Sequence, residues 1–254
     1  MPASTPHDSW AEAYDLACDE EFGELLGRIT AATLGLVADL LPKPGAIVDF
    51  GAGTGRLAIP LAAAGHAVVA VEPSAAMLDV LAAKAGPRGP CRVACRMQDY
   101  RGEARFDLAL CAFGVLSYVT TCDGLDAALA AARASLAPGG RILLDLPRAM
   151  LFASRRCETA RILREVDLEP LGAGLFAYCE RIELRDPSHV PSLRRYEDRF
   201  KIRAWSRGDL DRAAERVGLV VETDVSDRVP GSGADWLLLA PHDGISALPP
   251  RGSR

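Results

Sequence analysis

Three glycines and one carboxylate are the residues of this chain best suited to binding a nucleotide-like ligand. Gly51, Gly53 and Gly55 lie at alternate positions after an apolar run at 46–50, and a helical pattern begins at Leu57. Glycines at such a turn permit positive φ and let a ligand approach backbone N–H groups that a Cβ would shield. Glu72 follows a second apolar run, 21 residues beyond Gly51, the interval at which an acid can accept ribose hydroxyls. The pattern predicts a nucleotide-type site after a first strand.

The elements that would position these residues alternate between strand and helix. Apolar runs at 46–50, 67–71, 91–97, 106–112 and 141–146 predict five strands, and helical patterns separate several of them. Ser74 is the predicted N-cap of the helix after the second strand. Two more strands, at 219–225 and 236–240, follow a helix that starts with the capping-box-like Ser206-Arg207-Gly208-Asp209. This alternation predicts an α/β fold with a doubly wound, seven-stranded, mostly parallel sheet.

The glycine motif separates two classes of nucleotide-binding protein. A dinucleotide fingerprint needs glycine or alanine at position 56, which is Arg56 here. G-x-G-x-G after Val-Asp-Phe, an acid after each of strands two and three, and Leu-Ala-Pro-Gly-Gly at 136–140 instead resemble the class I S-adenosylmethionine-dependent methyltransferases. The resemblance covers about residues 40–147 firmly. It implies a Rossmann-like methyltransferase fold and S-adenosyl-L-methionine as cofactor.

The resemblance also implies which residues hold the cofactor. The glycine loop would line its methionine end, Glu72 its ribose, and Asp99 its adenine amino group, while two residues would lie below the sulfonium. The full set of predicted cofactor-binding residues is Gly51, Ala52, Gly53, Thr54, Gly55, Glu72, Pro73, Met77, Asp99, Tyr100, Ala112 and Phe113. Strand four ends in Cys-Ala-Phe-Gly and lacks the Asn/Asp-Pro-Pro-Tyr tetrad of methyltransferases that act on nucleobases or protein amides. That departure favours a small-molecule acceptor.

Two segments outside the core are expected to shape the acceptor site. In related enzymes an N-terminal helix covers the cofactor with a tyrosine near the donor, and Tyr14 resembles that residue; packing of Tyr14 with Trp10 on the sheet flank is the alternative. Between 148 and 204, apolar residues alternate with charged ones near 176–184 and 196–202, with a less regular run at 159–166. This predicts a small antiparallel insert above the site. We expect residues 1–41 to form a helical lid, 42–147 the cofactor-binding core, 148–204 the insert and 205–240 the end of the core. The tail at 241–254 is predicted to be disordered, as are residues 1–8.

The candidate proton acceptors are His189, Tyr14 and Tyr118, although a histidine in a proline-flanked loop is often only a surface residue. Residues 148–212 contain 14 basic and 11 acidic residues. An anionic substrate would explain that surplus, and so would cross-strand ion pairs. The seven cysteines and four histidines show no metal-ligand spacing, so no metal is predicted.

Composition limits the partners. The net charge is −5, which disfavours a nucleic-acid footprint, and no run is long and apolar enough for a membrane span. We expect a cytoplasmic monomer or homodimer that methylates nitrogen or oxygen of a small molecule or short peptide. The alternatives are an RNA or protein methyltransferase, a nicotinamide-dependent oxidoreductase, and a non-catalytic cofactor-binding protein.

Overall fold

Two sheets of different construction organise the chain in the computed structural model, which describes residues 5–185 and 193–242. The larger has seven strands in the order β10-β11-β5-β4-β1-β2-β3, and the smaller has four in the order β6-β7-β8-β9. The strands of the larger sheet are β1 (Ala46–Phe50), β2 (Ala67–Val71), β3 (Cys91–Val93), β4 (Phe106–Cys111), β5 (Leu136–Pro147), β10 (Leu219–Asp224) and β11 (Ala234–Pro241). Those of the smaller sheet are β6 (Arg155–Glu158), β7 (Ile162–Gly172), β8 (Leu175–Arg185) and β9 (Leu193–Arg203).

The larger sheet confirms the predicted doubly wound fold. Strands β1 to β5 are parallel to their neighbours, and β11 is antiparallel to both β5 and β10. The α-helices are α1 (Tyr14–Leu40), α2 (Ala58–Ala63), α3 (Ala75–Ala85), α4 (Cys122–Ser135) and α5 (Arg207–Arg216). Short 3-10 segments are η1 (Asp8–Ala13), η2 (Gly86–Arg88), η3 (Met97–Asp99), η4 (Val115–Tyr118), η5 (Ala149–Leu151) and η6 (Ser226–Arg228).

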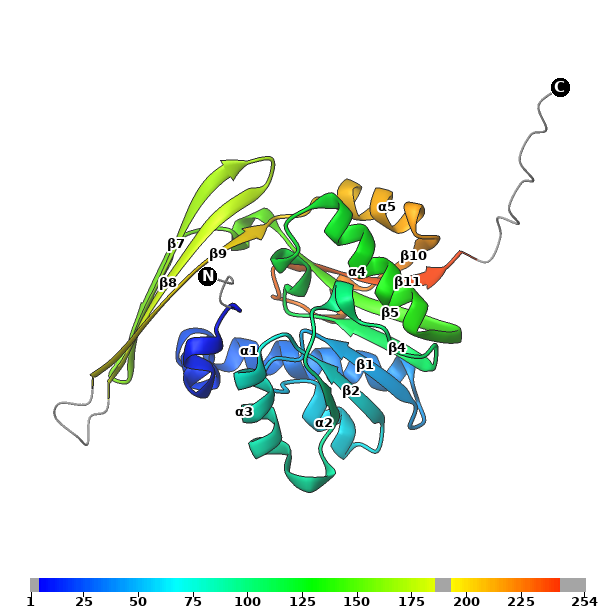
Figure 1. Cartoon of the computed structure of the whole chain (residues 1–254), viewed down its shortest axis with the longest axis horizontal. Helices are drawn as coiled ribbons and strands as arrows, with labels where there is room; N and C mark the ends of the chain where they lie inside the picture. The colour runs from blue at the N-terminus through cyan, green and yellow to red at the C-terminus, as the bar shows by residue number, and fades with distance from the viewer. Residues whose placement is uncertain (1–4, 186–192, 243–254) are drawn as a thin grey trace.

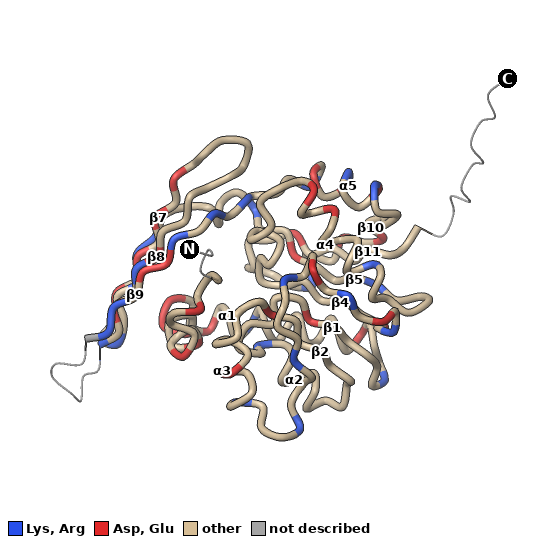
Figure 2. Tube along the Cα trace, in the orientation of Figure 1, with Lys and Arg blue, Asp and Glu red and all other residues tan. Residues whose placement is uncertain are grey.

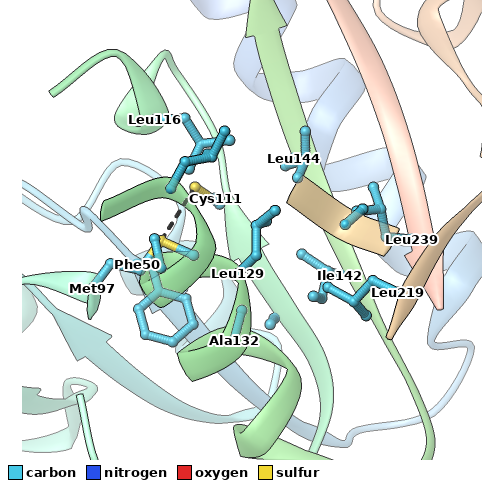
Figure 3. Packing of buried hydrophobic residues seen from close by; sticks show 14 of the residues in the cluster. Phe50, Met97, Cys111, Leu116, Leu129, Ala132, Ile142, Leu144, Leu219 and Leu239 are labelled. Atoms are coloured by element: carbon cyan, nitrogen blue, oxygen red, sulfur yellow. Dashed lines mark hydrogen bonds between the residues drawn. The ribbon is translucent and has the colours of Figure 1, made fainter. Parts of the chain in front are cut away.

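Apolar clusters on the two faces of the larger sheet hold the helices in place. On one face, residues of α4 and α5 such as Leu129 and Leu210 pack with Phe50 and Ile142, as Figure 3 shows in part. On the other face, α1, α2 and α3 pack against the same strands. Because both faces are covered, strands β1 and β4 are apolar almost throughout, as a buried parallel sheet requires. The carboxyl ends of these strands are therefore left to carry the site.

The predicted caps are present, and some predicted strand bounds change, since the fifth strand begins at Leu136 rather than at 141. Ser74 accepts from the backbone N of Met77 at the start of α3, and Ser206 and Asp209 form the capping box of α5. The third strand ends at Val93 rather than near 97, since η3 follows it. The long N-terminal helix begins at Tyr14 and kinks at Gly23, where φ is 50°.

The smaller sheet is the predicted antiparallel insert, and it stands apart from the larger sheet with the N-terminal segment between them (Figure 1). Alternate residues of β8, such as Tyr178 and Ile182, are buried on the face toward that segment. Basic and acidic residues lie next to one another along β7, β8 and β9 (Figure 2), as in the pair of Arg195 with Glu183. Within the described residues, no helix is both long and apolar enough to cross a membrane.

Candidate functional site

The glycine loop after β1 has the backbone that its sequence predicts. Gly51, Gly53 and Gly55 have φ of 68°, 52° and 91°, values that favour glycine. A Cβ on Gly51 would lie 2.3 Å from Cγ2 of Val115, whereas a Cβ on Gly53 would meet no atom within 4 Å. Gly51 is thus required for packing against η4, and Gly53 leaves its backbone open to an approaching ligand.

Glu72 ties this loop to the start of α3. Its side chain accepts from the backbone N of Gly53 at 3.0 Å and of Ser74 at 2.9 Å, and the residue is only 9% exposed. Burial raises the pKa of Glu72, and the two backbone N–H groups oppose that shift. A carboxylate can accept about four hydrogen bonds in all, so Glu72 retains capacity for the two hydroxyls of a ribose.

The other predicted cofactor residues divide into two groups. Ala52, Thr54, Met77 and Ala112 are buried near the glycine loop, at the start of α3 or at the end of β4. Phe113 follows with φ of 66° and lies under the Arg56 guanidinium, 5.7 Å from the ring centre.

The second group is placed differently. Tyr100 packs edge-on against Phe50 in the apolar core. Asp99 forms an ion pair with Arg96 at 2.6 Å, and Pro73 is exposed. These contacts of Tyr100 and Asp99 are with residues other than Glu72 and the glycine loop.

The N-terminal segment crosses this edge and contacts both sides of it. Ser74 Oγ donates to Asp8 at 2.6 Å, and Thr54 Oγ1 donates to Asp15 at 2.6 Å. The prediction of disorder at residues 1–8 is therefore wrong for the described residues 5–8, because His7 is buried and hydrogen-bonded. Residues 1–4 lie outside the described residues, as do residues 243–254 of the tail predicted at 241–254, whereas Pro241 ends β11.

An aromatic cluster joins the N-terminal segment to η4 and the insert. Trp10 stacks on Tyr14 at 5.4 Å between ring centres, and Tyr178 stacks on Phe200 at 4.5 Å. The His7 ring lies within 6.5 Å of these four rings and of Tyr118. Two of the predicted proton acceptors, Tyr14 and Tyr118, are thus brought to one site, and Tyr14 also makes the predicted contact with Trp10. The third, His189, lies outside the described residues.

Buried charged residues complete the cluster. Glu180 has no exposed surface and lies between His7 Nδ1 at 2.9 Å and the Arg164 guanidinium at 2.6 Å. Asp198 accepts from the backbone N of His7 at 2.8 Å and from Trp10 Nε1 at 3.0 Å. Burial would raise the pKa of Glu180, but the hydrogen bond from His7 and the charge of Arg164 hold it below its usual value.

Sequence reasoning missed His7, Arg164, Glu180 and Asp198, although a signal for Glu180 and Arg164 was present. Glu180 alternates in step with Tyr178 and Ile182, and Arg164 with Ile162 and Val166, so the alternation of each strand places these charged residues on the covered face. The atoms of His7, Glu180 and Asp198 lie close enough together to hold a metal ion. We assign no metal to them, because they are already hydrogen-bonded to one another and Glu180 is paired with Arg164.

Comparison with known proteins agrees with this geometry. Residues 47–140 match the family described as a methyltransferase domain. A curated relative, an uncharacterized methyltransferase of Bacillus licheniformis, is 36% identical over 81 residues, which are 30% of this chain and 36% of the relative. The match therefore spans about a third of that relative's length.

Solved structures share the fold over nearly the whole chain. A S-adenosylmethionine-dependent methyltransferase from Clostridium acetobutylicum is 15% identical with a TM-score of 0.76, covering 93% of this chain and 99% of that one. A sugar N-methyltransferase from a Streptoalloteichus species is 19% identical with a TM-score of 0.73, covering 96% and 98%. Residues 47–140 thus match a methyltransferase domain, and the fold of the whole chain is shared with S-adenosylmethionine-dependent methyltransferases, as the resemblance of the glycine loop and its following acid predicted.

Proposed function

We propose that this protein transfers a methyl group from S-adenosylmethionine to an amine nitrogen of a small molecule, with amino sugars as the acceptor class. The observation that carries the choice of an amine is the cluster of aromatic rings and buried carboxylates beside the glycine loop. Aromatic faces attract cations with roughly 0.5–2 kcal/mol per contact. The fold shared with a sugar N-methyltransferase supports the choice of a sugar.

The residues present fit the cofactor. Gly53 presents open space above its Cα, Glu72 has lone pairs left for ribose hydroxyls, and Met77 and Ala112 offer apolar surface. Asp99 is the proposed partner of the adenine amino group, because its side chain is 47% exposed. When bound, S-adenosylmethionine supplies a methyl group on a positively charged sulfur that any well-aligned lone pair can attack.

The chain's own contribution is to orient the acceptor and exclude water. Asp8 and Asp15 hold the N-terminal segment over the cofactor edge through Ser74 and Thr54. Proximity of this kind contributes up to roughly 7–11 kcal/mol in well-oriented systems. An amine must also lose its proton before it can attack, so a proton acceptor near the site is needed.

An anionic substrate gains no support from the insert. Exposed arginines of this sheet are paired with acids on the neighbouring strand, as Arg181 is with Asp167 and Arg195 with Glu183, and basic and acidic residues lie side by side along the sheet (Figure 2). We therefore propose that these basic residues serve cross-strand pairing and that the acceptor is selected for its amine.

The test is a transfer assay with labelled S-adenosylmethionine and matched acceptors. Amino sugars and their nucleotide derivatives would be compared with the same sugars bearing a hydroxyl in place of the amine. Label is expected in the amino sugars only. Label in the hydroxyl sugars instead would show an oxygen acceptor, and label in bulk RNA or protein would replace the small-molecule proposal. No transfer to any acceptor, with the cofactor bound, would favour a non-catalytic cofactor-binding protein.

A further inference from the structure

A series of hydrogen bonds runs from the hydroxyl of Tyr118, a partly exposed residue, to a buried ion pair. Tyr118 Oη lies 2.8 Å from His7 Nε2, and His7 Nδ1 lies 2.9 Å from Glu180 Oε2. Arg164 Nε donates to the other oxygen of Glu180 at 2.7 Å. Four elements supply these residues: the N-terminal segment, η4, β8 and β7. This series of hydrogen bonds therefore forms only while the N-terminal segment is docked.

The protonation state of Glu180 fixes the direction of these bonds. Since Arg164 and His7 hold the pKa of Glu180 below its usual value, the carboxylate is ionised and can only accept. His7 Nδ1 must then be the donor to Glu180, and in a neutral imidazole Nε2 carries no proton. When His7 is neutral, its Nε2 therefore accepts from the Tyr118 hydroxyl.

Tyr118 is placed to receive a proton from a ligand. The residue is 44% exposed, while its hydroxyl reaches inward to His7. It ends η4, whose first residue, Val115, packs against Gly51 of the cofactor loop. Burial and the nearby Tyr178 and Glu180 raise the pKa of the Tyr118 hydroxyl well above its usual value. The hydroxyl thus stays protonated. It can give its proton to His7 only when it receives another proton from the ligand.

We propose that Tyr118 and His7 form a proton relay that deprotonates the acceptor amine, an inference that rests on the proposed amine methylation. The N–H bond of the ammonium breaks and leaves its electron pair on nitrogen, while its proton bonds to Tyr118 Oη. The original Tyr118 proton moves to His7 Nε2. His7 becomes an imidazolium beside the Glu180 carboxylate, and it later releases the proton to solvent. Tyr118 would be the catalytic residue, and His7 acts through it.

Several groups bear on the charge of His7. The titratable side chains that face it are those of Tyr14, Glu72, Tyr118, Tyr178, Glu180 and Asp198. Three of them are carboxyl groups, and Arg164 offsets only the one on Glu180. These carboxyl groups would offset the charge of the imidazolium that the relay forms. A proton already on Nε2 would block the relay.

The first test needs no acceptor. NMR of the full chain with 15N-labelled histidine would read the protonation of both ring nitrogens, and His7→Gln would identify the His7 signals among the four histidines. In the neutral form at high pH, the proton is expected on Nδ1, and Tyr118→Phe should shift the Nε2 signal. A proton on Nε2, or an Nε2 signal unaffected by Tyr118→Phe, would overturn the relay.

The second test measures the pH profile of methyl transfer to the best amine acceptor between pH 5 and 8, where histidine changes charge. The rate should rise with pH in the wild type. Tyr118→Phe and His7→Gln should lower kcat at least tenfold at pH 8 and flatten that rise. Tyr196→Phe is the matched control, because its hydroxyl makes no hydrogen bond to other described residues; it should keep the slope.

The outcomes separate the two proposals. Amine methylation with an unchanged profile in Tyr118→Phe would reject the relay and leave the proposed function standing. If no amine is methylated, the proposed function fails and the relay fails with it. Unchanged melting temperatures of the variants would show that lost activity does not arise from unfolding.

Discussion

The buried carboxyl group of Asp145 should make the stability of this protein fall as pH rises. Asp145 lies in β5, is 5% exposed, and accepts from the backbone N of Gly114 at 2.9 and 3.1 Å. Burial raises its pKa from 3.8 to about 7, and the Gly114 N–H opposes that shift. Asn at this position keeps an acceptor for Gly114 but cannot ionise. We therefore expect Asp145→Asn to gain stability relative to the wild type as pH rises.

The magnitude follows from linkage between proton binding and folding. Between the unfolded and folded pKa values, the native state binds more protons than the unfolded state, so the free energy of unfolding falls with pH. Each pKa unit corresponds to about 1.4 kcal/mol. With a folded pKa of about 7, the wild type loses about 2–3 kcal/mol between pH 5 and pH 8 that the Asn variant does not lose.

The assay is urea unfolding of both proteins at several pH values from 5 to 8. The difference between them isolates Asp145, since the other groups titrate alike in both. Asp167→Asn is the control, because the Asp167 side chain is 58% exposed, and its difference from the wild type should stay nearly constant. A constant difference for Asp145→Asn across this range would refute the account of a buried, neutral carboxyl.

Three further substitutions test the loop, a cap and the core. Gly51→Ala should lose roughly 2–4 kcal/mol of stability, because positive φ is strained and its Cβ would overlap Val115; chemical denaturation measures this, and a loss below about 0.5 kcal/mol would contradict it. Ser206→Ala removes the capping box of α5 and should cost about 1 kcal/mol in the same assay, whereas an unchanged midpoint would show that the cap is dispensable. Leu129→Ala empties a site with no exposed surface and should lower stability by about 2–5 kcal/mol; a loss within the range of surface substitutions would mean that the site collapses.

The core of the fold could be predicted from sequence because its signals are local. Most strands of the larger sheet contain a short apolar run, and the capping residues Ser74 and Ser206 mark where helices begin. The positive φ of Gly51 follows from the glycine itself. The alternation in β8 and β9 likewise predicted a sheet with one covered face, which the burial of Tyr178 and Ile182 confirms.

The cluster around His7 could not be predicted in the same way, because contacts between residues far apart in the sequence determine it. His7 stands before any recognisable helix pattern, and its partners Glu180 and Tyr118 are 173 and 111 residues away. A charged residue in a strand is normally predicted to be exposed, and only a partner of opposite charge, which the sequence does not identify, explains its burial. The burial of Arg164 becomes intelligible only once Glu180 and the N-terminal segment are seen around it.

We expect S-adenosylmethionine to bind at the edge formed by the glycine loop and Glu72. Calorimetric titration of the full chain with this cofactor tests it most directly, with Glu72→Gln as the variant and the exposed Glu222→Gln as the matched control. We predict micromolar binding that Glu72→Gln weakens at least tenfold, about 1.4 kcal/mol, and that Glu222→Gln leaves unchanged. No binding by the wild type, or equal binding by Glu72→Gln, would contradict this assignment of the site.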